Sequence, residues 1–152
     1  MKFAFLIILL SVTFVVYGQD SLLNKAWINL TTQFKNRIHV ADKFGAFVLA
    51  SKSVDTPTVS NLRELSLSLT KRLNELVVPT KSAVDSIKTE NLLFIGALSK
   101  VLVLLEDDKD FRMRNDFKTF QTSLMSAENR IASARKDYNE ACKTTKRDDL
   151  IY

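Results

Sequence analysis

The chain has 152 residues, 46% of them hydrophobic and 26% charged, with a formal net charge of +5. This balance is typical of a single folded domain and excludes a wholly disordered chain. Three glycines and two prolines are too few for the many turns of a β-sandwich or barrel, so a few long helices are favoured. Lysines and arginines are scattered among acidic residues, so we predict no nucleic-acid partner. We interpret the charge as solvation, with weak attraction to anionic envelope surfaces as the alternative.

The first 18 residues have the layout of an export signal. A lysine precedes an apolar run over residues 3–17, and Gly18 provides a small residue for cleavage. We predict a signal peptide over residues 1–18, cleaved after Gly18. The alternative is an uncleaved anchor that contacts the membrane through residues 3–17, although a spanning helix needs about 20 apolar residues. Both versions place the domain of residues 19–152 outside the cytoplasm, periplasmic or secreted if cleaved and membrane-anchored if not.

The first helix of this domain is predicted over residues 21–49. Apolar residues recur there at steps of three and four, which places them on one stripe of a helix. Polar side chains between them, including Arg37, suit the side that faces water. Residues 50–60 break the period, and Thr58 or Ser60 is expected to cap the following helix. The stripe consists of Leu23, Trp27, Leu30, Phe34, Ile38, Ala41, Gly45 and Val48.

A second helical stretch starts near Asn61 and is interrupted at Pro79, because proline lacks the amide donor and crowds the preceding turn. After the interruption apolar residues again recur at helical spacing, with Asn91 as a polar member of the stripe. Residues 92–105 are apolar on more than one face, so we expect this helix to be the most central. Lys100 within it argues against a transmembrane segment.

The third helix has the most regular pattern, a heptad seam over four heptads. The seam consists of Met113, Phe117, Phe120, Leu124, Ala127, Ile131, Ala134, Tyr138, Ala141 and Thr145. We expect the tail after it, residues 148–152, to be frayed. The three stripes and their short connections predict an all-α fold. It is an antiparallel up-down bundle of three long helices, with the middle one broken near Pro79.

The residue sets of familiar catalytic and cofactor sites are absent from this sequence. His39 and Cys142 are the single histidine and the single cysteine, too few for a ferritin-type diiron site or a Cys/His zinc site. The isolated glycines exclude a phosphate loop, a dinucleotide fingerprint and a nucleophile elbow. We predict no catalytic residue, no cofactor, no metal and no enzymatic activity. Cys142 is interpreted as a small residue beside a helix seam, with an intermolecular disulfide or a reactive thiol as the alternative.

Residues 126–141 (SAENRIASARKDYNEA) closely resemble the C-terminal signature of the LemA family, and residues 110–117 (DFRMRNDF) resemble a second family stretch. The first helix is similar to that of the family at Ala26, Trp27, Gln33, Lys35 and Arg37. The resemblance covers most of residues 22–145. It implies an antiparallel helical bundle, an N-terminal membrane segment, an exterior or periplasmic domain and no established enzymatic activity. Departures in residues 38–44 and after the C-terminal signature indicate a shortened, diverged member.

The residues that carry the resemblance have two interpretations. One is a polar recognition patch for a protein partner. The other is structural, with Tyr138 filling a seam position while Glu128 and Arg135 pair with the neighbouring helix, and we favour it. The residues concerned are Ala26, Trp27, Glu128, Asn129, Arg130, Ile131, Ala132, Ala134, Arg135, Tyr138 and Asn139.

These features predict an exported, envelope-associated helical bundle that acts as a protein-interaction or scaffold module. The alternative is an extracytoplasmic carrier that holds a small hydrophobic ligand between its helices. An enzyme that uses carboxylates alone is a third class, for which no particular pair of carboxylates stands out. The identity of the partner and the oligomeric state stay open.

Overall fold

The computed structural model describes residues 2–50 and 53–152, with side chains from residue 21 onward except at residues 46, 47 and 50. The elements are α1 (Lys2–Ala50), α2 (Thr56–Glu75), α3 (Lys81–Asp107), α4 (Lys109–Arg112), α5 (Asn115–Thr144) and the 3-10 helix η1 (Asp148–Leu150). No strand occurs within these described ranges, so the predicted all-α class is confirmed.

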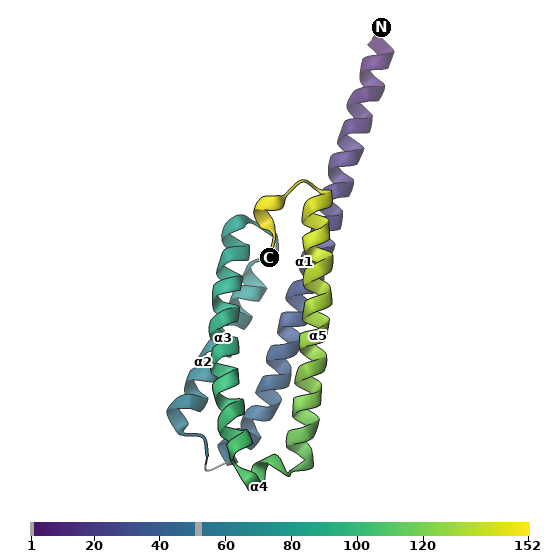
Figure 1. The fold of residues 1–152 in the computed structure, drawn as a ribbon. Helices are drawn as coiled ribbons and strands as arrows, with labels where there is room; N and C mark the ends of the chain where they lie inside the picture. Colours follow the sequence, from purple (N-terminus) through teal and green to yellow (C-terminus); the bar gives the residue numbers. More distant parts are fainter. Residues whose placement is uncertain (1, 51–52) are drawn as a thin grey trace.

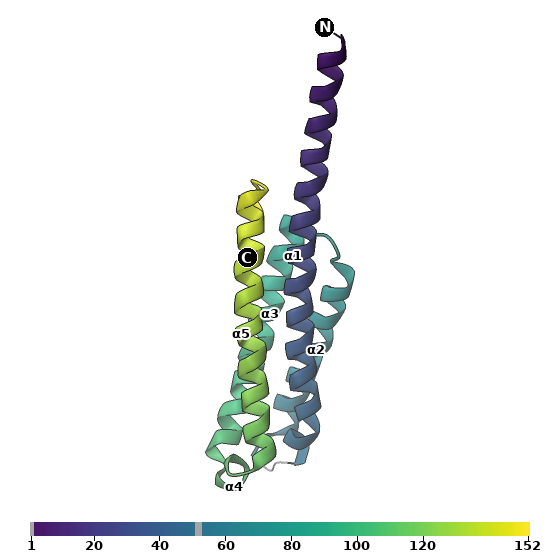
Figure 2. The ribbon, with the colours of Figure 1, turned by 90° about the vertical axis from the view of Figure 1, so that its right-hand side faces the viewer.

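The long helices α1, α2, α3 and α5 run alternately down and up along one bundle (Figures 1 and 2). Helix α1 packs against both α2 and α5, and α2 packs against α3. The backbones of α3 and α5 stay apart within the described part of the chain, although the Gln121 side chain of α5 donates to Glu106 of α3 at 2.8 Å. The first part of α1 extends beyond the other helices (Figure 1). The predicted leader lies in that part, where side chains are outside the described residues.

The prediction of three long helices with a broken middle one is not confirmed, because α2 and α3 lie side by side and not end to end. The break spans residues 76–80. Pro79 within it is buried and has no amide to donate, so the helix cannot continue through it. The Thr80 hydroxyl then accepts a 3.1 Å hydrogen bond from the Ala83 amide and starts α3 anew. Five residues are enough for the chain to reverse, so the stretch forms a helical hairpin.

Helix α2 starts earlier than the period predicted, and its cap is Asp55 in place of Thr58 or Ser60. The Asp55 carboxylate accepts a 2.7 Å hydrogen bond from the Thr58 amide, while Pro57 occupies the first turn, where no amide is needed. Hydrogen bonding from Thr58 lowers the pKa of this carboxyl, because it stabilises the charged form.

The core contains most of the predicted stripes of α1 and α5 together with one buried face each of α2 and α3. The seam prediction is confirmed for most positions of α5, but Met113 is exposed and precedes the helix. The expectation that residues 92–105 form the most central helix is wrong, since Leu92, Leu93 and Val103 are more than half exposed. Only one face of α3 is buried. Among the helices of the described chain, none is both long and apolar enough to span a membrane.

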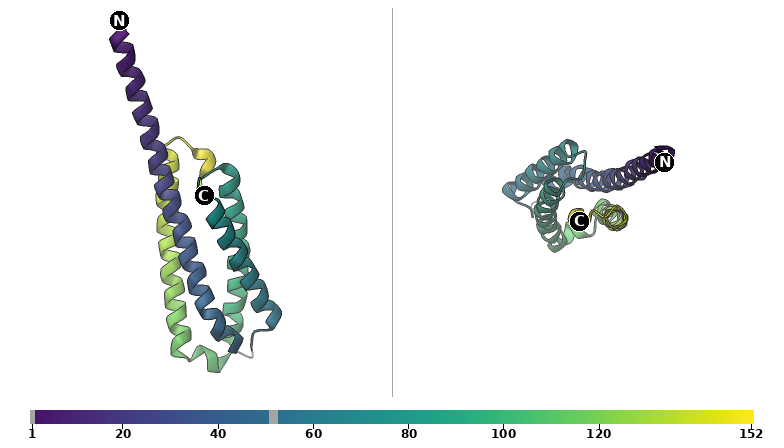
Figure 3. Two further views of the ribbon diagram at one scale, coloured as in Figure 1. Left: turned by 180° about the vertical axis from the view of Figure 1, so that it is seen from behind. Right: turned by 90° about the horizontal axis from the view of Figure 1, so that it is seen from above.

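The tail that was expected to fray is folded. It forms η1, buries the Leu150 side chain completely and turns back toward the bundle. Seen from above, the end of the chain lies beside α5 in the space that separates it from α3 (Figure 3). The tail therefore contacts both helices.

Candidate functional site

A buried arginine connects three helices in the middle of the bundle. Arg37 of α1 has no exposed surface. Its Nη1 donates to Glu128 Oε1 of α5 at 3.1 Å, and its Nη2 donates to Asn91 Oδ1 of α3. The guanidinium also lies 5.5 Å from the ring centre of Phe34 and 5.2 Å from that of Phe94. The arginine thus joins α1 to both α3 and α5.

The position of Arg37 has an energetic reason. A buried charge is tolerated only when it is paired and hydrogen-bonded, and aromatic faces add cation–π attraction. Arg37 satisfies these conditions through Glu128, Asn91 and two phenylalanine rings. Its Nε, however, is buried and has no hydrogen-bond partner among the described residues. The Nε–H donor of the guanidinium is therefore buried without an acceptor among the described residues.

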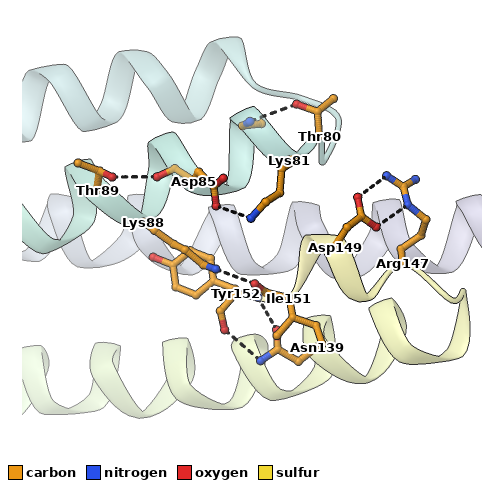
Figure 4. A network of polar contacts seen from close by, with 11 residues as sticks. Thr80, Lys81, Asp85, Lys88, Thr89, Asn139, Arg147, Asp149, Ile151 and Tyr152 are labelled. Atoms are coloured by element: carbon orange, nitrogen blue, oxygen red, sulfur yellow. Dashed lines mark hydrogen bonds and ion pairs between the residues drawn. The ribbon is translucent and has the colours of Figure 1, made fainter.

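The tail lies next to this arginine. The Tyr152 ring packs on Phe34 with the ring centres 5.5 Å apart. Lys88 of α3 donates to the Ile151 carbonyl at 2.6 Å, and its ammonium lies 5.5 Å from the centre of the Tyr152 ring. Asn139 of α5 donates to the Tyr152 carbonyl at 3.2 Å and accepts from the Tyr152 amide at 2.9 Å (Figure 4). The tail is therefore held from α1, α3 and α5 together.

The Tyr152 hydroxyl is buried without a hydrogen-bond partner among the described residues. Burial raises the pKa of this phenol to about 12, because the phenolate would lose its hydration. The charge of Arg37 opposes the shift, since it stabilises a negative charge on the oxygen. The phenol is consequently neutral when the tail is in place.

A second buried group joins the middle of α1 to the C-terminal part of α5 and to the end of α2. The Trp27 indole donates to the Leu76 carbonyl at 3.0 Å, and its ring centre lies 5.4 Å from that of Tyr138. Trp27, Tyr138 and Cys142 have no exposed surface. Burial raises the pKa of the Cys142 thiol and of the Tyr138 phenol above their ordinary values. This environment favours the structural interpretation of Cys142 over a reactive thiol.

The residues that carry the family resemblance separate into two groups. Trp27, Ile131, Ala134 and Tyr138 are buried, while Ala26 is half-buried. The predicted pairing of Glu128 with a neighbouring helix is confirmed by its bond to Arg37, and Asn139 holds the tail. Arg130 is exposed and donates to Ser126 on its own helix at 2.8 Å. Asn129, Ala132 and Arg135 are exposed, and the predicted ion pair of Arg135 is not seen in the described residues.

Two parts of this site were not predicted from the sequence. Arg37 was placed on the side facing water, whereas it is fully buried. The signal that pointed to a polar site was Asn91, an amide in an otherwise apolar stripe. Tyr152 had no such signal, because a short tail after a helix has no periodicity. No group of three or more histidine, cysteine or acidic side chains in the described chain is arranged to hold a metal ion.

A model of the LemA family matches residues 26–148, which is most of the chain. The protein belongs to the LemA family. The resemblance found in the sequence is thereby confirmed. No curated protein and no solved structure matches the chain. The matched region includes Arg37, Asn91, Glu128 and Asn139 but ends at Asp148, so most of the tail lies outside the LemA match.

Proposed function

We propose that this LemA protein is an extracytoplasmic, non-catalytic interaction module that binds an amphipathic helix of a protein partner. The observation that carries the proposal is an uncovered stripe along α3. Leu92 is 68% exposed and Val103 is 58% exposed, and Gly96 and Ser99 lie between them at helical spacing. Exposed apolar patches on folded proteins commonly mark interaction sites.

The stripe suits a helix more than a flat surface. A Cβ added at Gly96 would meet no atom within 4 Å, so the space above this residue is open. Small side chains at Gly96 and Ser99 allow a second backbone to approach closely, while Leu92 and Val103 contribute apolar contact at either end. This spacing matches the anchors that an amphipathic helix presents at steps of three, four and seven residues.

Photo-crosslinking in the native host tests the stripe. A crosslinker at Ser99 is expected to capture one defined partner, and the Leu92→Lys/Val103→Lys double variant is expected to lose it. Met125→Lys is the matched control, because Met125 is equally exposed but lies on α5. Equal capture from Ser99 in the double variant and in the wild type would contradict the proposal.

The compartment requires its own measurement. The proposal expects an intact mass that begins at Gln19 in the exported fluid, or a full-length chain in the membrane fraction with residues 19–152 outside. The first result would mean a released protein and the second an anchored one. A full-length chain confined to the cytosol would contradict both.

The second candidate function is a carrier of a small hydrophobic ligand, and a groove between α1 and α2 favours it. The groove has a volume of about 420 Å³, within the usual range for ligand sites. Gly45 lies in its wall, and a Cβ there would meet no atom within 4 Å. The other lining residues are Ala41, Asp42, Leu49, Val59, Leu62, Arg63 and Leu67.

Native mass spectrometry of the protein from its host distinguishes this candidate. A carrier is expected to retain a lipid or similar apolar molecule, and Gly45→Leu is expected to displace it by filling the groove. Gly96→Leu is the matched control, since it makes the same change at an equally open glycine on α3. Wild-type protein that carries no apolar molecule would weigh against the carrier.

A further inference from the structure

The tail reaches the bundle through a defined reversal of the chain. Lys146 has a φ of 57°, in the left-handed region that residues other than glycine seldom adopt. The Arg147 amide donates to the Cys142 carbonyl at 2.8 Å, which closes the end of α5. This reversal turns the chain back toward the bundle. The contacts that the tail makes there hold it in place.

Much of that contact is to the tail's backbone. The Asn139 side chain binds both the amide and the carbonyl of Tyr152, in the manner of a neighbouring β-strand. Lys88 binds the carbonyl of the preceding residue, Ile151 (Figure 4). These three bonds do not depend on the side chains of the bound segment. They are contacts to the main chain of the two residues that follow η1, and main-chain hydrogen bonds of this kind give affinity in peptide recognition.

The tail lies in a groove between α3 and α5. Two side chains of the tail enter this groove and give it selectivity. Leu150 has no exposed surface. Tyr152 packs its ring on Phe34 with the ring centres 5.5 Å apart, and its hydroxyl is buried. An apolar residue followed two positions later by an aromatic residue therefore fits the groove.

We propose that the groove between α3 and α5 in which the tail lies is a binding site for a short peptide whose apolar residue ends a 3-10 turn and is followed, two positions later, by an aromatic residue. In this structure the protein's own tail fills it. Asn139, Lys88 and Arg37 lie inside the region matched by the LemA model, whereas Leu150 and Tyr152 lie beyond it. The side chains that hold the tail thus lie within the LemA match, and a partner segment of the same chemistry displaces the tail from them. The inference is independent of the stripe on α3.

Competition between the tail and a free peptide tests the site in the full-length protein. The Leu150→Ser/Tyr152→Ala variant empties the groove, and the probe is a labelled peptide with the sequence of residues 147–152. A tethered segment competes at an effective concentration of about millimolar. We expect the emptied variant to bind the probe at least tenfold more tightly than the wild type does. A peptide with Tyr152→Ala is the control and is expected to bind at least tenfold more weakly than the probe.

Failure of a folded, emptied variant to bind the probe, or equal binding of both peptides, would overturn the proposal. If the emptied variant does not fold, hydrogen exchange in the wild type and in Asn139→Leu decides the question. The Tyr152 amide is expected to lose its protection in Asn139→Leu, while the amides of α5 keep theirs. Unchanged protection would show that Asn139 does not hold the segment. A concentration-dependent dimer that disappears in the emptied variant would assign the groove to the tail of a second copy and overturn occupation by the chain's own tail.

Discussion

Arg37 and Glu128 form an ion pair whose two ends lie in different surroundings. The arginine side chain is 0% exposed and the glutamate side chain is 44% exposed, with 3.1 Å between Nη1 and Oε1. Water therefore reaches the carboxylate but not the guanidinium. The cation depends on its partners for stabilisation, whereas the anion does not depend on the cation to the same degree.

This asymmetry predicts that substitutions at Arg37, Asn91 and Glu128 change the free energy of unfolding in a non-additive way. Glu128→Ala leaves a buried cation without its countercharge and is expected to lower the free energy of unfolding by about 3 kcal/mol. Replacing the whole polar group with apolar residues, as in Glu128→Ala/Arg37→Met/Asn91→Leu, is expected to recover most of that loss, because no buried charge remains. Urea unfolding followed by circular dichroism measures both.

Glu140→Ala is the matched control, because Glu140 lies on the same helix in an exposed pair with Lys143. Exposed pairs contribute about 0–1 kcal/mol, so this change should have little effect. A triple variant less stable than Glu128→Ala alone would show that Arg37 stabilises the bundle by means other than its charge pairing.

The hydrogen bond from the Trp27 indole to the Leu76 carbonyl predicts a modest and local loss of stability when the donor is removed. Trp27→Phe keeps most of the apolar volume but removes the indole donor, so the free energy of unfolding is expected to fall by roughly 1–3 kcal/mol. Thermal unfolding by circular dichroism measures this. Hydrogen exchange should show the loss concentrated at the end of α2 and the start of α3. A loss spread evenly over all helices would mean that packing, and not the bond, sets the effect.

Burial of Cys142 predicts slow thiol chemistry. The thiol has no exposed surface and its pKa is raised, so little thiolate is present at neutral pH. We expect native protein to resist a disulfide exchange reagent that reacts promptly with the protein in concentrated guanidinium. Reaction of the native chain at the rate of the unfolded one would restore the reactive-thiol interpretation.

The raised pKa of Tyr152 predicts that the tail is released at high pH. The pKa of the phenol is about 12 with the tail bound and near its ordinary value of 10.0 when the tail is free. Binding therefore favours the neutral phenol. Its stabilisation is complete below pH 10 and is lost as pH rises toward 12. Tyrosinate absorbance, compared between the wild type and Tyr152→Phe, should show a missing late step in the variant. A Tyr152 step near pH 10 in the wild type would mean that the phenol is not buried.

Much of the α1 and α5 packing was predictable because a period of three and four residues is a local property of the sequence. Trp27, Phe34, Ile131 and Tyr138 are buried as their spacing predicts. The same reasoning misplaced residues 92–105, since a helix that is apolar all round does not reveal which face its neighbours cover. It also misplaced Arg37, whose long side chain reaches inward from the border of the stripe.

The sequence by itself determined the helical class, the end of the first helix, the position of the break near Pro79, the span of α5 within a few residues, and membership of the LemA family. These depend on neighbours along the chain, such as the proline that ends a helix and the hydroxyl or carboxylate that begins one. Only the tertiary structure decided that α2 and α3 form a hairpin, that Arg37 joins α1 to Asn91 and Glu128, and that Tyr152 lies against Phe34. Those contacts join residues far apart along the chain. Their free energy depends on which surfaces meet, and no local pattern records that.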